Sequence, residues 1–258
     1  MESKSVIHKN ARIGKNVKIG PFCVIGENVT IKDNCEIHSN IVIDGNVLIK
    51  KNTQIFPFAS IGTMPQDLKY KGEKTKIIIG EDCKIREYVT INLGTQGGGG
   101  VTRIGKNCLL MVGTHIAHDC CVGDNVIFAN HSTLAGHVDI QNNVVVGALS
   151  AIHQFTRIGE GSMIGGMSGV TADVIPFSTV LGNRAKLSGL NLIGLKRSKF
   201  NKNEINELRK VFKYIFHGKD NTLNQRTREI REKKYEFYTI KKLLDFIEGD
   251  TQRSFCLP

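Results

Sequence analysis

Apolar residues recur at every sixth position along most of this chain, and this period limits the folds that it can adopt. The first block of the period consists of isoleucines alone: Ile7, Ile13, Ile19, Ile25, Ile31, Ile37, Ile43, Ile49, Ile55 and Ile61. The period resumes at Ile79 and, shifted by one residue, runs from Ile104 to Val170. Because an α-helix would need a spacing of about 3.6 residues, the pattern argues against a helical repeat.

A six-residue period with β-branched residues at the repeating site predicts short strands wound into a prism, the hexapeptide parallel β-helix. Three sides of about six residues make one coil of about 18 residues. Residues one coil apart should therefore stack on neighbouring strands about 4.8 Å apart. This spacing predicts that Gly136 lies beside His118 and that His137 lies beside Asp119.

Seven cysteines are present, and none forms a CxxC pair. Five of them stand four residues after the repeating apolar residue: Cys23, Cys35, Cys83, Cys108 and Cys120. That position can share the narrow interior of the prism, so we interpret these cysteines as small buried hydrophobic residues. We expect no metal and no cofactor.

Two segments depart from the repeat, and we predict that they are loops at 62–78 and 93–103. The first contains Pro65 and a charged stretch, and the second has four glycines in a row. Loops on a rigid scaffold commonly carry function, although the glycine run could also be a flexible excursion.

Beyond Pro176 the repeat stops, and helical spacing of apolar residues begins at Asn201. Gly218 stands where the first helix should end, and a second helical stretch covers about 221–248. The sequence therefore predicts two domains: a β-helix over 1–183 that carries the catalytic site, and a basic α-helical domain over 184–258 that caps it.

The net charge of +11 favours an acidic partner. We find no aromatic RNA-binding signature, so we expect no nucleic acid. No apolar run approaches the roughly 18 residues of a membrane span, and the opening residues MESKS lack the apolar core of a signal peptide. We therefore expect a cytoplasmic protein without a transmembrane segment.

Histidines gather in a short part of the second block: His115, His118, His131, His137 and His153. The coil spacing places His118, Gly136 and Gln154 in one line along the prism, and we expect His153 and His137 to be neighbours there. A line of titratable groups is a candidate catalytic site. A zinc hydrolyase of the carbonic anhydrase type is an alternative, although zinc would need three imidazoles converging at about 2.0–2.1 Å.

Six motifs, in order along the whole chain, carry a resemblance to a known family: GTMPQDLKY (62–70), REYVTIN (86–92), HIAHDC (115–120), STLAGHV (132–138), IHQF (152–155) and LNLIGLKR (190–197). They resemble the UDP-N-acetylglucosamine O-acyltransferases, which catalyse the first step of lipid A synthesis. The resemblance implies a left-handed parallel β-helix with a C-terminal helical domain, assembled as a homotrimer with sites between adjacent prisms. It also implies UDP-N-acetylglucosamine and a hydroxyacyl-acyl carrier protein as substrates.

By this resemblance, His118 is the general base that takes the proton of the sugar 3-hydroxyl as that oxygen attacks the thioester. A histidine suits this role because its ordinary pKa, near 6.5, leaves it mostly neutral at pH 7. Asp119 would orient the imidazole, and the backbone N–H of Gly136 would hold the oxyanion.

The same resemblance implies a larger set of substrate-binding residues: Asp67, Lys69, His115, His137, His153, Gln154, Gly166, Asn191 and Arg197. Asn191 and Arg197 would contact the uracil and phosphate end, where Ile193 and Ser198 depart from the family pattern and leave a thinner phosphate clamp. Gly166 stands where the family sets acyl length, and glycine leaves that groove open. The sibling N-acyltransferase has an additional N-terminal domain, for which a repeat starting at Ile7 leaves no room.

Overall fold

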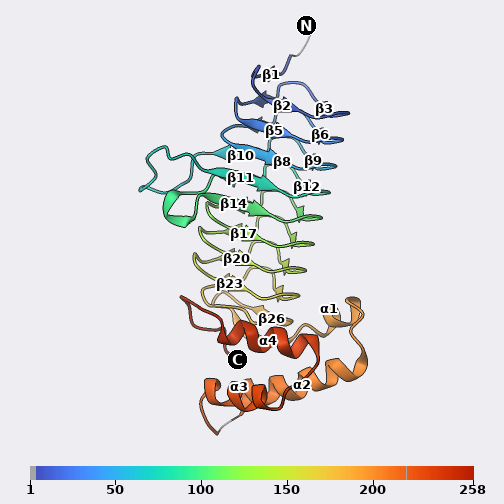
Figure 1. The fold of residues 1–258 in the computed structure, drawn as a ribbon, viewed down its shortest axis with the longest axis vertical. Coiled ribbons are helices and arrows are strands. Elements are labelled where there is room, and N and C mark those ends of the chain that lie inside the picture. The colour runs from blue at the N-terminus through green and yellow to red at the C-terminus, as the bar shows by residue number, and fades with distance from the viewer. Residues whose placement is uncertain (1–3, 219) are drawn as a thin grey trace.

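The computed structural model describes residues 4–218 and 220–258, so the first three residues of the opening MESKS lie outside it. The chain winds into a long three-sided prism of stacked coils, with helices gathered at its C-terminal end (Figure 1). Each side is a parallel sheet in which neighbouring strands come from successive coils. The predicted parallel β-helix is therefore present.

The strands belong to three sheets, which we call sheets A, B and C. Sheet A contains β1 (Val6–Ile7), β4 (Val24–Ile25), β7 (Val42–Ile43), β10 (Ser60–Thr63), β13 (Thr90–Asn92), β16 (His115–Ile116), β19 (Thr133–Leu134), β22 (Ala151–Ile152) and β25 (Gly169–Val170). Sheet B contains β2 (Arg12–Ile13), β5 (Val29–Ile31), β8 (Val47–Ile49), β11 (Lys76–Ile79), β14 (Val101–Ile104), β17 (Cys121–Val122), β20 (Asp139–Ile140) and β23 (Arg157–Ile158). Sheet C contains β3 (Lys18–Ile19), β6 (Glu36–Ile37), β9 (Gln54–Ile55), β12 (Lys84–Ile85), β15 (Leu109–Leu110), β18 (Ile127–Phe128), β21 (Val145–Val146), β24 (Met163–Ile164), β26 (Ser178–Leu181) and β27 (Lys186–Leu190).

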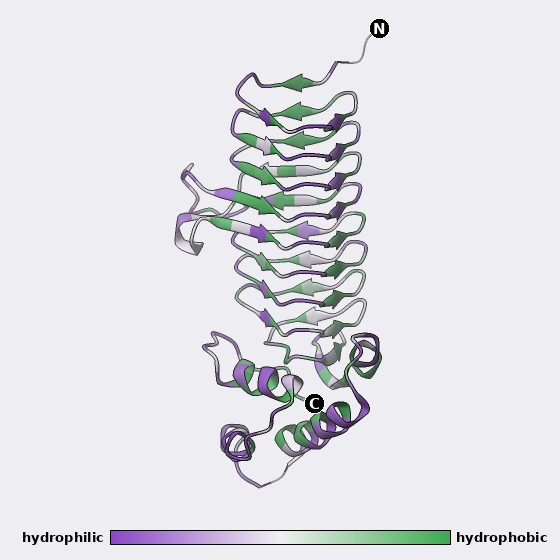
Figure 2. Cartoon of the chain, turned by 45° about the vertical axis from the view of Figure 1, so that its right-hand side comes forward, coloured by the Kyte–Doolittle hydropathy of each residue, from purple (hydrophilic) through white to green (hydrophobic). Residues whose placement is uncertain are grey.

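The repeating apolar residues fill the interior of the prism. Strand register pairs Ile7 with Ile25 and Ile116 with Leu134, so residues one coil apart stack as the period predicts. From Ile25 onward the repeating side chains are buried, whereas Ile7 and Ile13 in the first coil are exposed. Strands coloured as hydrophobic recur along the whole stack in Figure 2. The five cysteines assigned to the interior are buried, and all seven cysteines are free thiols.

The corners of the prism are tight turns that place one residue per turn in the left-handed region. At the corner between sheets B and C this residue is Asn16, Asn34, Asn52 and Asn125 on different coils, with φ between 55° and 60°. Asn and Asp tolerate this conformation better than other non-glycine residues because their short polar side chains can bond locally. Turn chemistry therefore holds the three sides at a fixed angle.

The two excursions are shorter than the predicted 62–78 and 93–103. β10 runs to Thr63 and β11 begins at Lys76, so the first excursion spans residues 64–75. The second spans 93–100, contains a short 3-10 helix (Gln96–Gly98), and ends where β14 begins. Sheet pairing extends into both segments, because the β11 strand pairs with β14 over four residues. Both excursions leave the same corner, on the left of Figure 1.

The prediction that the repeat stops beyond Pro176 is wrong at the level of pairing. β26 continues sheet C, with Val180 beside Ile164, but its spacing is 16 residues and not 18, which hides it from the period. β27 then turns back antiparallel to β26. The helical part therefore begins later than residue 184, at Leu192.

Four α-helices follow within the part of this region that the structure describes: α1 (Leu192–Arg197), α2 (Lys202–His217), α3 (Leu223–Glu232) and α4 (Tyr238–Glu248). Gly218 caps α2, as predicted, but the second helical stretch is broken into α3 and α4. Apolar faces of α2 and α4 are buried, including Leu208, Ile215 and Leu243. Among the helices of the described residues, none combines the length and apolar character that crossing a membrane requires.

Candidate active site

The candidate site lies on the corner between sheets A and B, below the two excursions. On three successive coils the left-handed turn residues at this corner are Asp119, His137 and Phe155, with φ of 59°, 61° and 62°. Their side chains therefore form one column. The ring of His137 stacks on that of Phe155, with centroids 4.5 Å apart, and meets the ring of His118 edge-on at 5.0 Å.

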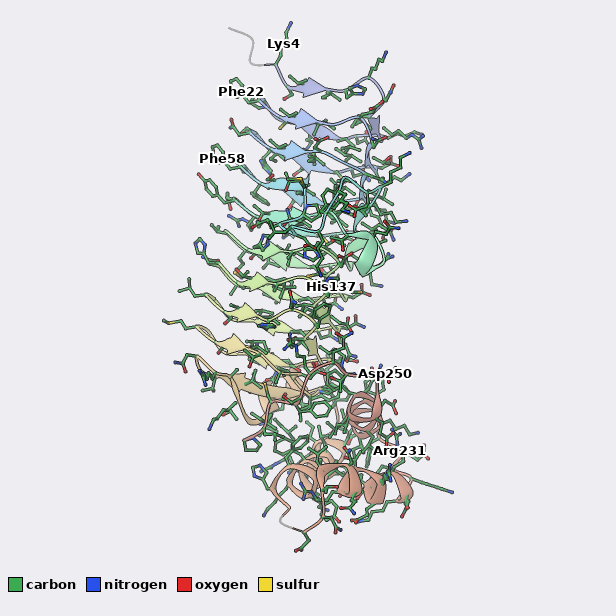
Figure 3. The ribbon with its side chains drawn as sticks, turned by 90° about the vertical axis from the view of Figure 1, so that its left-hand side faces the viewer. Lys4, Phe22, Phe58, His137, Arg231 and Asp250 are labelled. Carbon is green, nitrogen blue, oxygen red and sulfur yellow. The ribbon has the colours of Figure 1, made fainter. Side chains whose placement is uncertain are left out.

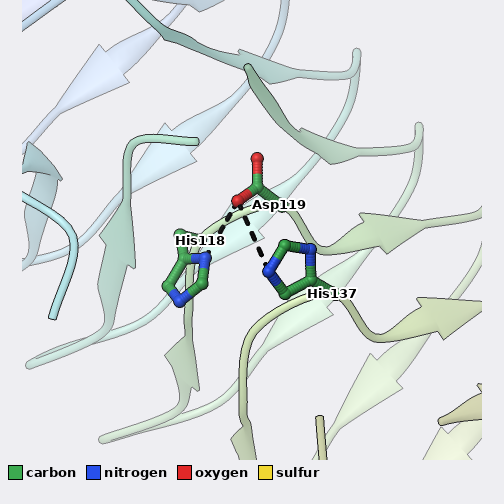
Figure 4. A group of neighbouring side chains, drawn as sticks. All are labelled: His118, Asp119 and His137. Carbon is green, nitrogen blue, oxygen red and sulfur yellow. Dashed lines mark hydrogen bonds and ion pairs between the residues drawn. The ribbon is translucent and has the colours of Figure 1, made fainter. Parts of the chain in front are cut away.

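His118 and Asp119 form a buried pair. Nδ1 of His118 lies 2.9 Å from Oδ2 of Asp119, and the Asp119 side chain is fully buried (Figure 4). Oδ2 lies 4.0 Å from Nε2 of His137. Since a carboxylate can only accept, His118 donates from Nδ1, and its Nε2 keeps the lone pair. Nε2 has no hydrogen-bond partner among residues 4–218 and 220–258.

The glycine-rich excursion holds Asp119 in place. The backbone N–H of Thr95 donates to both carboxylate oxygens, at 2.9 and 3.0 Å, and its hydroxyl donates to Oδ2 at 2.6 Å. From the adjoining strand, the Thr102 hydroxyl accepts the N–H of Asp119 at 2.9 Å. A Cβ added to Gly98 would lie 2.0 Å from Cγ of Asp119, so only glycine permits this approach. The glycine run is therefore part of the site, although the sequence left its purpose open.

Gly136 lies against the imidazole of His118, where the coil spacing predicts it. A Cβ at Gly136 would lie 2.5 Å from Cε1 and 2.6 Å from Nε2 of His118. The N–H of Gly136 has no acceptor within the described part of the chain. The site thus presents an unpaired imidazole nitrogen and a free backbone donor side by side.

Burial lowers the pKa of two histidines near His118, which favours their neutral forms. Burial lowers the pKa of His137, despite the opposing charges of Asp119 and Asp67. Burial, and then the neighbouring His118, also lowers the pKa of His115, whose Nδ1 lies 2.7 Å from the Thr90 hydroxyl. Neutral imidazoles can still donate and accept hydrogen bonds, so both can bind polar groups without carrying charge.

The 64–75 excursion closes a cavity of about 250 Å³ over this corner, lined in part by Asp67, Lys69, Thr95 and His137. Asp67 accepts the N–H of Lys69 at 2.9 Å, which fixes the turn that carries both side chains. Tyr70 and Glu73 also line the cavity. Tyr70 ends the motif at 62–70 but was given no role, and Glu73 lies outside all six motifs. The structure therefore brings Asp67 and Lys69 to His137.

A second cavity of about 400 Å³ shares His137 and Phe155 with the first as lining residues. Its remaining walls are Arg157 and the C-terminal residues Asp250, Thr251 and Gln252. His137 and Asp250 lie on the same edge of the molecule in Figure 3, opposite the edge from which Phe22 and Phe58 project. No pattern in the sequence marks this C-terminal segment as part of the site, because it has neither a repeat nor a helical spacing of apolar residues.

His153 was expected to be a neighbour of His137, and the described contacts of the two side chains are with other residues. Phe155, not His153, stands one coil after His137, and His153 is bonded to Arg253. The carbonyl of Gln154 accepts from the same arginine. His131 lies outside the site, because it occupies a turn between sheets C and A, where its ring covers Gly113.

Three further expected residues lie away from His118 in one chain. Asn191 caps α1: its Oδ1 accepts the N–H of Gly194, and its Nδ2 donates to the carbonyl of Gly161. Arg197 is exposed in the last turn of α1, and neither residue lines the two cavities at His137. Gly166 is exposed after β24, and a Cβ there would meet only Ala148, at 3.3 Å or more.

Donor atoms of His118, Asp119 and His137 lie within 4.8 Å of one another, a spacing that could suit a metal ion. The lone pairs of Asp119, however, already accept bonds from Thr95 and His118. The donor set fits a hydrogen-bonded catalytic pair better than a metal centre, which would need these bonds broken.

Comparison with known sequences places the chain beside enzymes of one activity. Residues 173–256 match the family model described as UDP N-acetylglucosamine O-acyltransferase, domain 2, and residues 4–39 and 102–136 match bacterial transferase hexapeptide repeats. The acyl-[acyl-carrier-protein]–UDP-N-acetylglucosamine O-acyltransferase of Paracoccus denitrificans is 49% identical over 204 residues, covering 79% of this chain and 77% of the relative. The enzyme of the same name from Aliarcobacter butzleri is 50% identical over 76% of this chain and 75% of its own length.

Solved structures agree over nearly the whole length. The UDP-N-acetylglucosamine acyltransferase of Campylobacter jejuni has a TM-score of 0.92 at 38% identity and covers 98% of this chain and 97% of its own. That of Francisella novicida has a TM-score of 0.94 at 36% identity, over 98% and 92%. These matches confirm the left-handed β-helix with a helical C-terminal part, and the chain belongs to the UDP-N-acetylglucosamine O-acyltransferase family of acyltransferases.

Proposed function

We propose that this chain transfers a (3R)-3-hydroxyacyl group from acyl carrier protein to the 3-hydroxyl of UDP-N-acetylglucosamine, the first step of lipid A biosynthesis. Family membership supports this reaction over the zinc hydrolyase and the sibling N-acyltransferase. The observation that carries the mechanism is the pairing of His118 Nδ1 with buried Asp119, which leaves Nε2 free beside the Gly136 amide.

His118 acts as the general base in this proposal. Its Nε2 takes the proton of the sugar 3-hydroxyl while the oxygen attacks the thioester carbonyl. Asp119 fixes the tautomer and stabilises the imidazolium that forms, as a buried carboxylate does in other catalytic pairs. The imidazolium then returns the proton to the departing thiolate of the carrier, so charge and protons balance over the transfer.

Gly136 supplies the oxyanion donor. The tetrahedral intermediate places negative charge on the former carbonyl oxygen, and a backbone N–H stabilises such charge at no cost in reorganisation. The missing side chain at Gly136 lets the reacting carbon approach both this N–H and Nε2 of His118. One base and one donor side by side are the minimum that acyl transfer requires.

The cavity under the 64–75 excursion is the proposed acceptor pocket. Of the residues proposed to bind the sugar and the adjacent acyl group, three line this cavity: Asp67, Lys69 and His137. The other three lie outside its walls: His115, His153 and Gln154. Neutral His137 and His115 suit sugar hydroxyls, and the Lys69 ammonium suits a phosphate oxygen. Gly166 would border the acyl groove.

The proposed assembly is a homotrimer with composite sites. Asn191 precedes α1 as its N-cap, and Arg197 is the last residue of this helix. In Figures 1 and 2, α1 lies away from the two excursions. If Asn191 and Arg197 bind the uracil and phosphates, they must do so for a neighbouring copy. Asn191 already caps its helix with both amide atoms, so Arg197 is the freer of the two to bind a ligand.

A cytoplasmic location belongs to the same proposal. All seven cysteines are free, which suits a reducing compartment.

Replacing His118 by alanine tests the mechanism. Turnover should fall by about 10² to 10⁴, the usual range for losing a general base. The matched control is His131→Ala, which removes an exposed imidazole from another corner and should leave turnover within about twofold of wild type. Product is identified by mass spectrometry after incubation with UDP-N-acetylglucosamine and hydroxyacyl carrier protein. Folded His118→Ala protein that keeps more than about a third of wild-type turnover, with chemistry rate-limiting, would refute the assigned base.

A further inference from the structure

Arg253, in the C-terminal segment after α4, contacts the turn that follows β22. The guanidinium of Arg253 donates from Nε to the carbonyl of Gln154 at 3.2 Å, and its Nη2 lies 2.8 Å from Nδ1 of His153. Both contacted residues belong to the turn that continues into Phe155, the ring stacked on His137. One arginine side chain thus forms a two-pronged contact with the turn.

This contact decides the tautomer of His153. An arginine can only donate, so Nδ1 of His153 must accept, and in a neutral ring the proton then sits on Nε2. Nδ1 also lies 3.2 Å from the Gln154 carbonyl, which would require a proton on Nδ1 instead. The arginine contact is the shorter, and that carbonyl already accepts from Arg253 Nε, so the Nε2–H form satisfies more of the groups present.

Arg253 is itself held by a network that ends on a buried carboxylate. The Thr251 hydroxyl accepts the N–H of Arg253 at 3.1 Å and donates to Oδ2 of Asp173 at 2.6 Å. Asp173 is fully buried, and its Oδ2 also accepts from Nε of Arg157 at 2.7 Å. Arg157 in turn lies over the ring of Phe246, 4.4 Å from its centroid. The contact between Arg253 and His153 is therefore connected both to the prism, through Asp173, and to α4, through Phe246.

We propose that Arg253 is a positioning residue that fixes His153 as an Nε2–H donor, which then bonds an oxygen of the bound substrate. The ring nitrogen opposite Arg253 is the one available to a ligand, since the His153 side chain is exposed. The oxygen belongs to a hydroxyl or carbonyl group, because a neutral N–H bonds such acceptors without the cost of burying a charge. This inference rests on the proposed function for its substrate, but not for the tautomer.

The tautomer is measured directly by NMR. Protein labelled with ¹⁵N-histidine is recorded at about pH 8, where a free imidazole is neutral, and the His153 signals are identified by their loss in His153→Gln. The wild type should show a protonated Nε2 and an unprotonated Nδ1. Arg253→Gln should give a mixture of tautomers, whereas Arg253→Lys, which keeps a donor, should retain the wild-type form. A protonated Nδ1 in the wild type would overturn the proposal.

Steady-state kinetics test whether the Nε2–H tautomer of His153 contributes to substrate binding. Losing one aligned neutral hydrogen bond should raise KM for UDP-N-acetylglucosamine or for the acyl donor about fivefold in Arg253→Gln, with kcat changed less. Arg253→Lys should recover most of the loss. In a His153→Ala background, Arg253→Gln should have no further effect. The matched control, Arg228→Gln, alters an exposed arginine of α3 and should leave both constants unchanged.

A merely structural role for Arg253 gives a different pattern. Its loss would then add to that of His153→Ala, and kcat and KM would change together with the melting temperature. That result overturns the inference and leaves the acyltransferase assignment intact. Conversely, absence of acylated product from the wild-type enzyme would refute the proposed function, while the NMR result would still report on the tautomer.

Discussion

At the scale of single residues, backbone position decides which side chains meet. Asp119, His137 and Phe155 come together because each occupies the left-handed place of one turn on successive coils. Spacing alone therefore predicted that Gly136 faces His118 and that His137 faces Asp119. Thr95 and Arg253 could not be predicted in this way, because they belong to segments outside the six-residue period. In such segments, the sequence does not indicate which residues lie next to which strands.

Gly98 gives a residue-scale prediction. Gly98→Ala would push a methyl group into the Asp119 carboxylate, which four hydrogen bonds hold in place. We expect kcat to fall by at least about tenfold, because His118 loses the partner that orients it. Gly97→Ala, in the same excursion, adds a methyl with nothing within 4 Å, so kcat should change little although Gly97 lines the proposed acceptor pocket. Steady-state turnover of the two variants would decide; equal activities would show that the close approach at Gly98 is not needed.

Gly166 gives another, concerning acyl length. Gly166→Met would project several heavy atoms from the turn after β24, where only Ala148 is near. Each methylene kept out of the groove forfeits about 0.8 kcal/mol, so excluding four costs about 3 kcal/mol, on the order of a hundredfold in preference. We expect the wild type to accept chains of about 14 carbons and the variant to prefer chains of about 10. Competition between the two donors measures the ratio, and an unchanged ratio would remove Gly166 from length selection.

At the scale of elements, the sequence predicts the strands and helices that follow a regular spacing, but it does not predict those that depart from it. The isoleucine period predicted the coils, but it did not predict β26, because this strand lies 16 residues after its partner β24 and not 18. The break between α3 and α4 was not predicted either, since apolar spacing continues through residues 233–237, which are not helical. In both cases tertiary pairing, which one sequence does not display, sets the boundary.

The excess of basic residues in the helical part leads to a prediction about how the acyl donor binds. It holds about twice as many Lys and Arg as Asp and Glu, and on α2 Arg209, Lys213 and His217 border an apolar cavity of about 450 Å³. An acidic carrier protein docking there should bind more weakly as salt rises, mainly through slower association, because exposed charges are screened beyond about 8 Å at physiological ionic strength. Stopped-flow association at low and high salt measures this. A rate independent of salt would mean that the carrier docks elsewhere.

At the scale of the whole molecule, the residues of the proposed site lie on two separate parts of the chain. His118 and the two cavities lie on one corner, and α1 with Arg197 lies elsewhere. The family resemblance implied a trimer, but a single sequence does not reveal which surfaces of neighbouring copies meet. The exposed apolar residues Phe22, Phe58 and Met167, on a different corner from His118, are candidates for the contact.

Mixed assemblies test this arrangement. His118→Ala and Arg197→Ala chains should each be impaired alone. If each site takes His118 from one copy and Arg197 from another, co-expression in equal amounts should restore about a quarter of wild-type sites by random pairing. Turnover of the purified mixture is compared with that of the separate variants. No gain on mixing would place both residues in the site of the same chain.

The column of turns at the catalytic corner has one more consequence. Each residue of the site is located by its neighbours one coil above and below, and not by its distance from either end of the chain. Duplicating or losing a complete coil would lengthen or shorten the prism by about 4.8 Å and return every column to phase. An insertion of any other length must bulge outward, as 64–75 and 93–100 do. Over generations, such a protein can change its height in whole steps while its chemistry stays in place.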